Sequence, residues 1–182
     1  MLIKSRMGIS ADGFVATPDG WPALLTAPDF VPAVSHGYPE FIEGVDAVVM
    51  GRSTFVLSLR SPDSPWKGLQ VFVLTSRPLP DGTPDGVVVV AQGGPAGLLE
   101  QLRSRGSDGD VHLVGGPRTI QAFRDLGALD RLELVVLPIL LGAGVPLSPA
   151  STNPAGTEPL PLRLDSTRRF PDGSVELAYA AK

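Results

Sequence analysis

The feature that most constrains the fold of this chain is a series of short apolar runs, rich in Val, Leu and Ile, that alternate with segments of helical spacing. A strand of a parallel sheet is covered by helices on both faces, so its sequence is an almost continuous apolar run. A Pro-Asp-Gly turn at 171–173, between two further runs, is typical of an antiparallel hairpin. The expected strands are Leu2–Met7, Val45–Met50, Leu69–Leu74, Val87–Ala91, Val111–Val114, Leu132–Leu140, Leu160–Arg169 and Ser174–Ala180.

Helical signals lie between these strands. Because strand and helix alternate through the middle of the chain, we expect an α/β fold with a mostly parallel sheet and helices on both faces. The stretch 147–159, rich in Pro, Gly and Ser, is expected to be a long loop within the domain. Helices are expected at 53–59, capped by Ser53 or Thr54, at 95–104, at 117–126 and, interrupted by prolines and a glycine, at 30–45.

Composition excludes several classes of site. The 182-residue chain has no Cys, which rules out disulfides, thiolate metal ligands and Cys nucleophiles. Its two histidines, His36 and His112, lie far apart in sequence, so no metal site is expected. The balance of 15 basic and 19 acidic residues gives no electrostatic reason to expect nucleic acid as a partner. With no signal-peptide pattern and no apolar run long enough to span a bilayer, the chain is expected to be cytoplasmic, with no membrane partner.

Three turns that follow apolar strands carry residues suited to a dinucleotide. The first, Gly51–Thr54, opens a helix with hydroxyl side chains and with an arginine able to bind phosphate in bidentate fashion. The second, Gly115-Gly116, lets the backbone approach a ligand without a Cβ in between. The third, Ser76-Arg77, offers a hydroxyl and a cation to a ribose phosphate, which favours NADP over NAD. Each turn by itself is explained equally well without a ligand: the first as a helix cap, the second as a tight turn and the third as an exposed loop.

The order of these turns, together with two flanking motifs, resembles a known family. The opening segment Ile9–Ala16 is similar to the family's SLDG-aromatic signature, and Met50–Phe55 is similar to its GRxT-aromatic cofactor motif. Val114–Gly116 resembles its glycine pair, and Pro138–Leu147 resembles its PxLLGxGxPL segment. These four motifs, within Leu2–Leu147, are similar to those of the RibD C-terminal-like reductases of the dihydrofolate reductase superfamily.

The resemblance implies a dihydrofolate reductase-like three-layer αβα sandwich, with a mostly parallel central sheet and a C-terminal antiparallel hairpin, in one domain over 1–182. It also implies NADPH as cofactor, hydride transfer to a small heterocyclic, pyrimidine- or pterin-like substrate, and a homodimer. The apolar strand at 132–141 suits a dimer interface, although a buried central strand would read the same way. The cofactor-binding residues implied are Ser10, Gly51, Arg52, Ser53, Thr54, Thr75, Ser76, Arg77, Val114, Gly115, Gly116, Arg118 and Thr119.

Reduction of a C=N bond also needs a proton, usually from a carboxyl group or a water that it orients. The resemblance points to two candidate catalytic acids. Asp12 belongs to the opening signature, but it also reads as a residue that shapes a turn with Gly13. Asp29 lies near the position of the acid in dihydrofolate reductases. His36 and Glu40 read either as substrate contacts or as solvated residues of the interrupted helix.

Two other functions stay open at the level of sequence. One is a reductase that acts specifically in riboflavin or folate biosynthesis. The other is a protein that binds NADP without turnover and serves in sensing or assembly. Stoichiometric hydride transfer to an acceptor separates an enzyme from a sensor.

Overall fold

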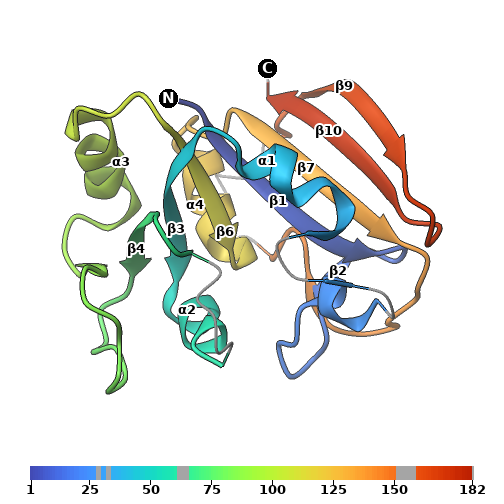
Figure 1. The fold of residues 1–182 in the computed structure, drawn as a ribbon, viewed down its shortest axis with the longest axis horizontal. Helices are drawn as coiled ribbons and strands as arrows, with labels where there is room; N and C mark the ends of the chain where they lie inside the picture. The colour runs from blue at the N-terminus through green and yellow to red at the C-terminus, as the bar shows by residue number, and fades with distance from the viewer. Residues whose placement is uncertain (28–29, 32–33, 61–65, 151–158, 182) are drawn as a thin grey trace.

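The computed structural model describes residues 1–27, 30–31, 34–60, 66–150 and 159–181 (Figure 1). The strands are β1 (Ile3–Ser10), β2 (Phe14–Ala16), β3 (Val45–Gly51), β4 (Gln70–Leu74), β5 (Val88–Val90), β6 (Asp110–Gly115), β7 (Arg131–Leu137), β8 (Val145–Pro146), β9 (Leu162–Arg169) and β10 (Val175–Ala181). Eight of them form one sheet in the order β5-β4-β3-β6-β1-β7-β10-β9, and β2 pairs with β8 in a small second sheet. The strands from β5 to β7 are parallel, and β10 runs antiparallel to both β7 and β9.

Helices cover both faces of the large sheet, as the sequence predicts (Figure 1). Two of them, α3 and α4, lie on one face, and the remaining helices lie on the other, with α1 in front of β1 and α4 behind the sheet in Figure 1. The helices are η1 (Ala23–Thr26), η2 (Ser35–Gly37), α1 (Tyr38–Ile42), α2 (Arg52–Ser58), α3 (Gly94–Ser104) and α4 (Pro117–Asp125), where η marks a 3-10 helix.

The face under α3 and α4 is an ordinary apolar core. Leu98 and Leu102 lie one turn apart on α3 and are fully buried, as is Phe123 on α4. They pack against the inward side chains of the strands, among them Val111 and Leu113 of β6. Burial of this apolar surface is the main source of stability for this half of the sandwich.

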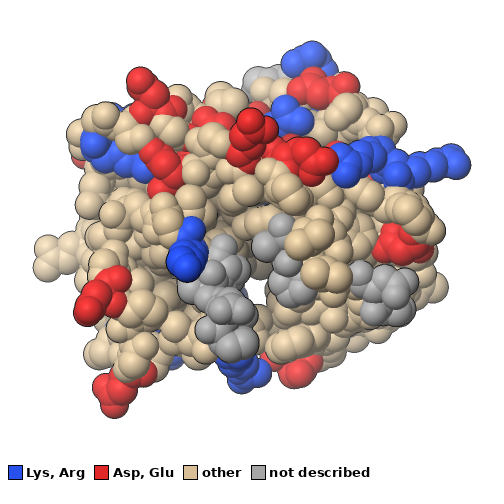
Figure 2. All heavy atoms as spheres, viewed as in Figure 1, with Lys and Arg blue, Asp and Glu red and all other residues tan. Residues whose placement is uncertain are grey.

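The face under α1 is polar. Lys4 and Arg6 from β1, His112 from β6 and Glu133 from β7 are all buried there. Arg6 forms ion pairs with Glu133 and with Glu176 of β10, the second at 2.6 Å. Acidic and basic side chains are also interspersed on the surface of this side of the molecule, without one large field of a single sign (Figure 2). The α1 face is therefore held together by charge pairs where the opposite face is held together by apolar packing.

All eight predicted strands are present, six of them within two residues of the expected bounds and two with larger differences, and the structure adds β2 and β8. β1 continues past the expected end at Met7 to Ser10, because it keeps pairing with β7 up to Leu137. β7 ends at Leu137 and does not reach Leu140, since Pro138 has no N–H to donate to a ladder. β7 lies between β1 and β10, so its apolar sequence is that of an interior strand of the sheet.

Two helix predictions are corrected. The N-cap of α2 is Gly51, in extended conformation and without a side-chain cap, so neither Ser53 nor Thr54 caps the helix as expected. The helix expected over 30–45 is broken into η2 and α1, and the break includes His36, whose backbone is left-handed at φ 58°. Prolines and glycines in this stretch interrupt the regular hydrogen-bond ladder.

Among the described helices, none is both long enough and apolar enough to span a bilayer. No cluster of His, Asp and Glu suited to a metal ion occurs in the part of the chain that the structure describes. Residues 151–158 of the predicted loop lie outside that part.

Candidate cofactor and active site

The turn after β3 and the turn after β6 lie against each other at the carboxyl edge of the sheet. A Cβ added to Gly51 would lie 3.2 Å from Oγ1 of Thr119, and one added to Gly116 would lie 3.8 Å from Oγ1 of Thr54. The two turns come together because β3 and β6 are neighbouring parallel strands. Two motifs that are distant in sequence thus form one wall, at the edge where α/β proteins bind their ligands.

Glycine is required in the second turn for backbone geometry. Gly115 has φ 125°, a value that residues with a Cβ rarely adopt, and the Gly115–Gly116 peptide is cis. A Cβ at Gly115 would lie 3.6 Å from Sδ of Met7 on β1, so the turn packs closely on the neighbouring strand. The backbone of this turn is left bare toward the carboxyl edge.

The third turn, after β4, is fastened to the first. Nε of Arg52 donates a hydrogen bond of 3.0 Å to the carbonyl oxygen of Pro78. Within the turn, Oγ1 of Thr75 accepts a 3.0 Å bond from the N–H of Arg77 and donates one of 3.0 Å to its carbonyl. Arg52 and Thr75 therefore shape the third turn, and Arg77 itself is exposed at its surface.

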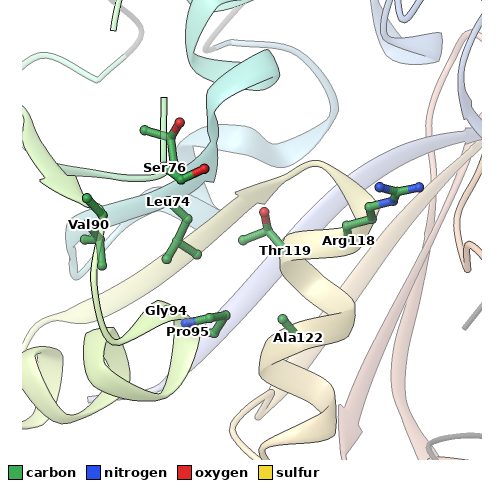
Figure 3. Close-up of a pocket in the computed structure, with 10 residues that line it drawn as sticks. Leu74, Ser76, Val90, Gly94, Pro95, Arg118, Thr119 and Ala122 are labelled. Atoms are coloured by element: carbon green, nitrogen blue, oxygen red, sulfur yellow. The ribbon is translucent and has the colours of Figure 1, made fainter. Parts of the chain in front are cut away.

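A cavity of about 320 Å³ lies between the turn after β4, the end of β5 and the starts of α3 and α4 (Figure 3). Figure 3 shows Ser76 on one side of the cavity and Pro95 and Ala122 on the other, with the hydroxyl of Thr119 between them and Arg118 at the rim, pointing away from the centre. The volume is in the range of small-molecule sites, and the mixture of apolar wall and few hydroxyl groups is typical of them. The lining residues are Leu74, Thr75, Ser76, Val90, Ala91, Gly94, Pro95, Arg118, Thr119 and Ala122.

Sequence reasoning missed the wall made by β5 and α3. Gly94 and Pro95 line the cavity at the first turn of α3, next to Ala91. A signal for them was present: the chain has Gly-Gly-Pro after β5, at 93–95, as it has Gly-Gly-Pro after β6, at 115–117. A second Gly-Gly-Pro between a strand and a helix is a reason to expect a second backbone surface at the same edge.

Asp12 holds two loops together. Its Oδ1 accepts a 3.1 Å bond from the N–H of Leu141, and its Oδ2 accepts a 2.7 Å bond from the N–H of Gly142. A side-chain hydrogen bond from Ser10 and the two backbone N–H groups lower the pKa of the Asp12 carboxyl below its usual value, against a smaller effect of desolvation. At neutral pH Asp12 is therefore a charged acceptor in an exposed loop contact, and its catalytic role stays a prediction.

The predicted site residues fall into separate groups. Thr75, Ser76, Arg118 and Thr119 line the cavity, and Gly51, Thr54, Gly115 and Gly116 form the adjoining pair of turns. Other predicted residues do not line the cavity. Ser53 and Arg77 are exposed, and Val114 packs in an apolar cluster with Trp66. Ser10 is buried and its hydroxyl accepts the N–H of Phe14, while Asp29 lies outside the described residues.

Comparison with known proteins identifies the family. The sequence matches the RibD C-terminal domain over residues 2–175. The chain belongs to this family. The uncharacterized protein YwjB of Bacillus subtilis (strain 168) is 29% identical over 175 residues, which cover 95% of this chain and 94% of YwjB. The α/β fold, with its mostly parallel sheet and its antiparallel C-terminal strands, matches that of RibD-like structures.

Solved structures agree with this assignment. The putative riboflavin biosynthesis protein from Shewanella sp. PV-4 superposes with a TM-score of 0.83 at 27% identity, covering 100% of this chain and 99% of that one. A diaminohydroxyphosphoribosylaminopyrimidine deaminase/5-amino-6-(5-phosphoribosylamino)uracil reductase from Thermotoga maritima has a TM-score of 0.69 at 14% identity, covering 100% of this chain and 56% of that one. The second likeness shows the fold alone.

Proposed function

We propose that this RibD-family protein binds NADPH at the carboxyl edge of the sheet and reduces a small heterocyclic substrate, pyrimidine- or pterin-like in shape. The observation that carries the proposal is one cavity lined by residues of two predicted turns, Thr75 and Ser76 after β4 and Arg118 and Thr119 after β6, with the first turn adjoining the second. The nicotinamide ring supplies a hydride when the cofactor is bound.

The residues present fit a dinucleotide. Gly51 and Gly116 let the two facing turns approach closely, since a Cβ at Gly51 would lie only 3.2 Å from Oγ1 of Thr119. In this proposal, backbone N–H groups at the start of α4 bind phosphate oxygens. The nine-residue helix α4 begins there, with Arg118 at its second position. In this proposal the guanidinium of Arg118 binds phosphate, and the exposed Arg77 binds the 2′-phosphate that distinguishes NADPH from NADH.

The chain's own part is to orient and to exclude water. Asp12 secures the loop after β1 to the loop after β7, and Ser10 accepts the N–H of Phe14 within the loop after β1. The loop after β1 lies beside the turn after β6, because β1 and β6 are neighbouring parallel strands. In this proposal the loop lies along the nicotinamide edge, where Asp12 acts as a positioning residue. The Thermotoga maritima relative carries the name of a pyrimidine reductase, which supports a planar nitrogen heterocycle as the substrate class.

The proposal is tested by titrating the protein with NADPH and NADH, using nicotinamide fluorescence or calorimetry. We expect tighter binding of NADPH, and a loss of about tenfold or more in Arg118→Ala or Arg52→Ala, since a charge-assisted hydrogen bond contributes about 1.5–3 kcal/mol. Arg77→Ala should weaken NADPH and leave NADH nearly unchanged. Arg103→Ala, in the last turn of α3, is the matched control and should bind like the wild type.

Failure of the wild-type protein to bind either nucleotide would refute the reductase proposal. NADPH binding without oxidation across a panel of pterin and pyrimidine acceptors would favour the sensing or assembly protein. Reduction of a ribosylaminopyrimidine phosphate alone would favour a dedicated riboflavin-pathway enzyme, and reduction of dihydrofolate alone a folate-pathway enzyme.

We also propose that the protein is a homodimer in the cytoplasm. β9 forms one edge of the sheet, all eight of its residues are exposed, and Leu164 is 50% exposed. Long exposed edge strands are ordinarily paired or protected in proteins. Light scattering after size exclusion should give twice the chain mass of 19.0 kDa, and a monomer at micromolar concentration would contradict the proposal.

A further inference from the structure

His36 has an unusual backbone at the entry to α1. Its φ and ψ angles are 58° and 33°, and it is the one residue other than glycine with positive φ among those that the structure describes. Its carbonyl oxygen accepts a hydrogen bond from the guanidinium of Arg6. A left-handed backbone is unfavourable for a residue with a Cβ, although histidine is among those that tolerate it best. The surroundings therefore hold His36 in place.

The imidazole ring is fixed as firmly as the backbone. Nε2 lies 2.7 Å from Oδ2 of Asp172, and the side chain is only 6% exposed. The same carboxylate accepts hydrogen bonds from Ser174, at 2.9 Å from the N–H and 2.8 Å from the hydroxyl. Phe30 stacks on the ring at 6.0 Å and Phe170 meets it edge-on at 5.0 Å. Because a carboxylate only accepts, Nε2 carries a proton, and Nδ1 is the nitrogen available for further chemistry.

Nδ1 of His36 is buried and has no hydrogen-bond partner among the described residues. A buried polar atom without a partner is unfavourable, so a donor or acceptor from outside the chain is expected to contact it. A histidine with one nitrogen held by a carboxylate and the other unpartnered is the arrangement of a general acid or base.

The histidine lies on the side of the molecule where the proposed reaction takes place. The turn that carries Asp172 packs on the loop after β7, since a Cβ at Gly173 would lie 3.6 Å from Cγ of Pro138. The loop after β1 bonds the same segment, through a 2.8 Å hydrogen bond from the N–H of Ala11 to the carbonyl oxygen of Ile139. Both loops lie at the carboxyl ends of β1 and β7, next to the turn after β6.

We propose that His36, oriented by Asp172, is the proton donor to the heterocycle that the protein reduces, with Nδ1 hydrogen-bonded to a ring nitrogen of the substrate. This inference rests on the proposed function. The carbon of a substrate C=N bond accepts the hydride of NADPH, the π electron pair moves to nitrogen, and that nitrogen takes the proton of the imidazolium Nδ1. The N–H bond at Nδ1 breaks, the ring becomes neutral and keeps its Nε2–H bond to Asp172, and solvent returns the proton after release.

The charges around the ring come from three elements. Asp172 lies in the hairpin turn, Arg6 comes from β1, and Arg168 of β9 lies against Gly37, 3.1 Å from the position of its absent Cβ. Glu40, on α1, pairs with Arg168 at 3.4 Å. Asp172 contacts the imidazole directly, with its Oδ2 2.7 Å from Nε2.

The first test is a direct contact measurement. Only two histidines occur in the chain, so long-range 1H–15N spectra resolve all four ring nitrogens, and a His36→Asn variant assigns them. The NADP⁺-loaded protein is titrated with dihydropterin, diaminouracil and diaminopyrimidine. We expect the Nδ1 signal of His36 to move on binding of at least one probe while the signals of His112 stay in place. No response of His36 to any probe would overturn the proposal.

The second test is turnover. Asn keeps the left-handed backbone accessible but transfers no proton, so His36→Asn should lower kcat by roughly 10²–10⁴-fold. Asp172→Asn should lower kcat with little change in KM. Asp165→Asn removes a carboxylate from the same hairpin, paired only with the exposed Arg163, and should behave like the wild type. Wild-type kcat in His36→Asn with any acceptor that the wild type reduces would overturn the proposal.

NADPH affinity is measured on every variant to separate the two proposals. Unchanged affinity shows that His36→Asn is folded and that any loss lies in the proton step. If the wild type binds no nucleotide, the proposed reductase function fails, and the response of His36 to the probes alone still decides whether Nδ1 is a ligand contact.

Discussion

His112 should make the stability of this protein fall in mild acid. The ring is 3% exposed in the middle of β6, and its two nitrogens have no hydrogen-bond partner among the described residues. Burial lowers its pKa to about 3, and the nearby charges of Lys4 and Arg6 act in the same direction. Phe41 meets the ring edge-on at 4.7 Å, which leaves no room for a hydrated imidazolium on that side.

The size of the effect follows from linkage. In the unfolded chain His112 has the ordinary value of 6.5, so below that pH the unfolded state binds a proton that the folded state does not. Stability is then lost as the pH falls from 6.5 toward 3, by about 1.4 kcal/mol for each pH unit once the unfolded histidine is protonated. Between pH 7 and pH 5 this amounts to about 2 kcal/mol. A domain of this size should lose about 4–8 °C in Tm from this group alone.

The measurement compares the wild type with His112→Phe, which keeps an aromatic ring at the position but does not titrate. Urea unfolding is recorded at pH 7 and at pH 5 for both proteins. Other groups contribute equally to both, so the difference between the two pH dependences isolates His112. We expect the wild type to lose about 2 kcal/mol more than the variant. Equal losses would show that the imidazole is protonated or solvated in the folded protein, and would refute the reasoning.

Two further outcomes follow from the charged contacts. Replacing Arg6 by Met should destabilise the protein by about 3 kcal/mol, the lower end of the range for a broken buried ion pair, since Glu133 and Glu176 each lose an ion pair and the first keeps a second arginine at 2.8 Å. Replacing all three by apolar residues should restore most of that loss in thermal unfolding, and a triple variant as unstable as the single one would contradict this account. Asp12→Asn should speed hydrogen exchange at the N–H groups of Leu141 and Gly142, and unchanged exchange there would show that the carboxylate does not hold the loop.

Most of the sheet could be predicted because buried strands consist mainly of apolar residues. The run Val45–Met50 is apolar except for Asp46, and it forms an interior strand with a neighbour on each side. β1 is different, since Lys4, Arg6 and Ser10 face the polar side of the sheet and break the apolar run. Its end was therefore predicted too early, at Met7. Strand prediction depends on apolar burial, and it weakens where a strand buries charge.

The candidate site was predicted in part, for a related reason. Glycine turns and hydroxyl residues have local signatures, so Gly51, Gly116 and Thr119 were found from sequence and are adjacent in the structure. The bonds from Leu141 and Gly142 to Asp12 join residues about 130 positions apart, and no local pattern records such a contact. The family signature predicts Asp12 as a catalytic acid, which stays a prediction, and it did not reveal that the carboxylate also accepts hydrogen bonds from the loop after β7.

The differences between the predicted and the observed structure have a common cause, which is the polar α1 face. A sandwich of this size gains its stability from apolar burial. Burying charges under the five-residue helix α1 therefore lowers stability, and the fold does not require these charges. The opposite face, with Leu98, Leu102 and Phe123, shows that the chain has the residues to build an ordinary core. The buried charges under α1, and the ring nitrogens of His36 and His112 that have no partner among the described residues, are therefore best explained by what that face binds. His36 and His112 both lie on this face, the first beside the carboxyl edge and the second beneath α1. The ligand titration tests whether His36 contacts a ligand, and the unfolding experiment tests whether His112 is buried without a proton.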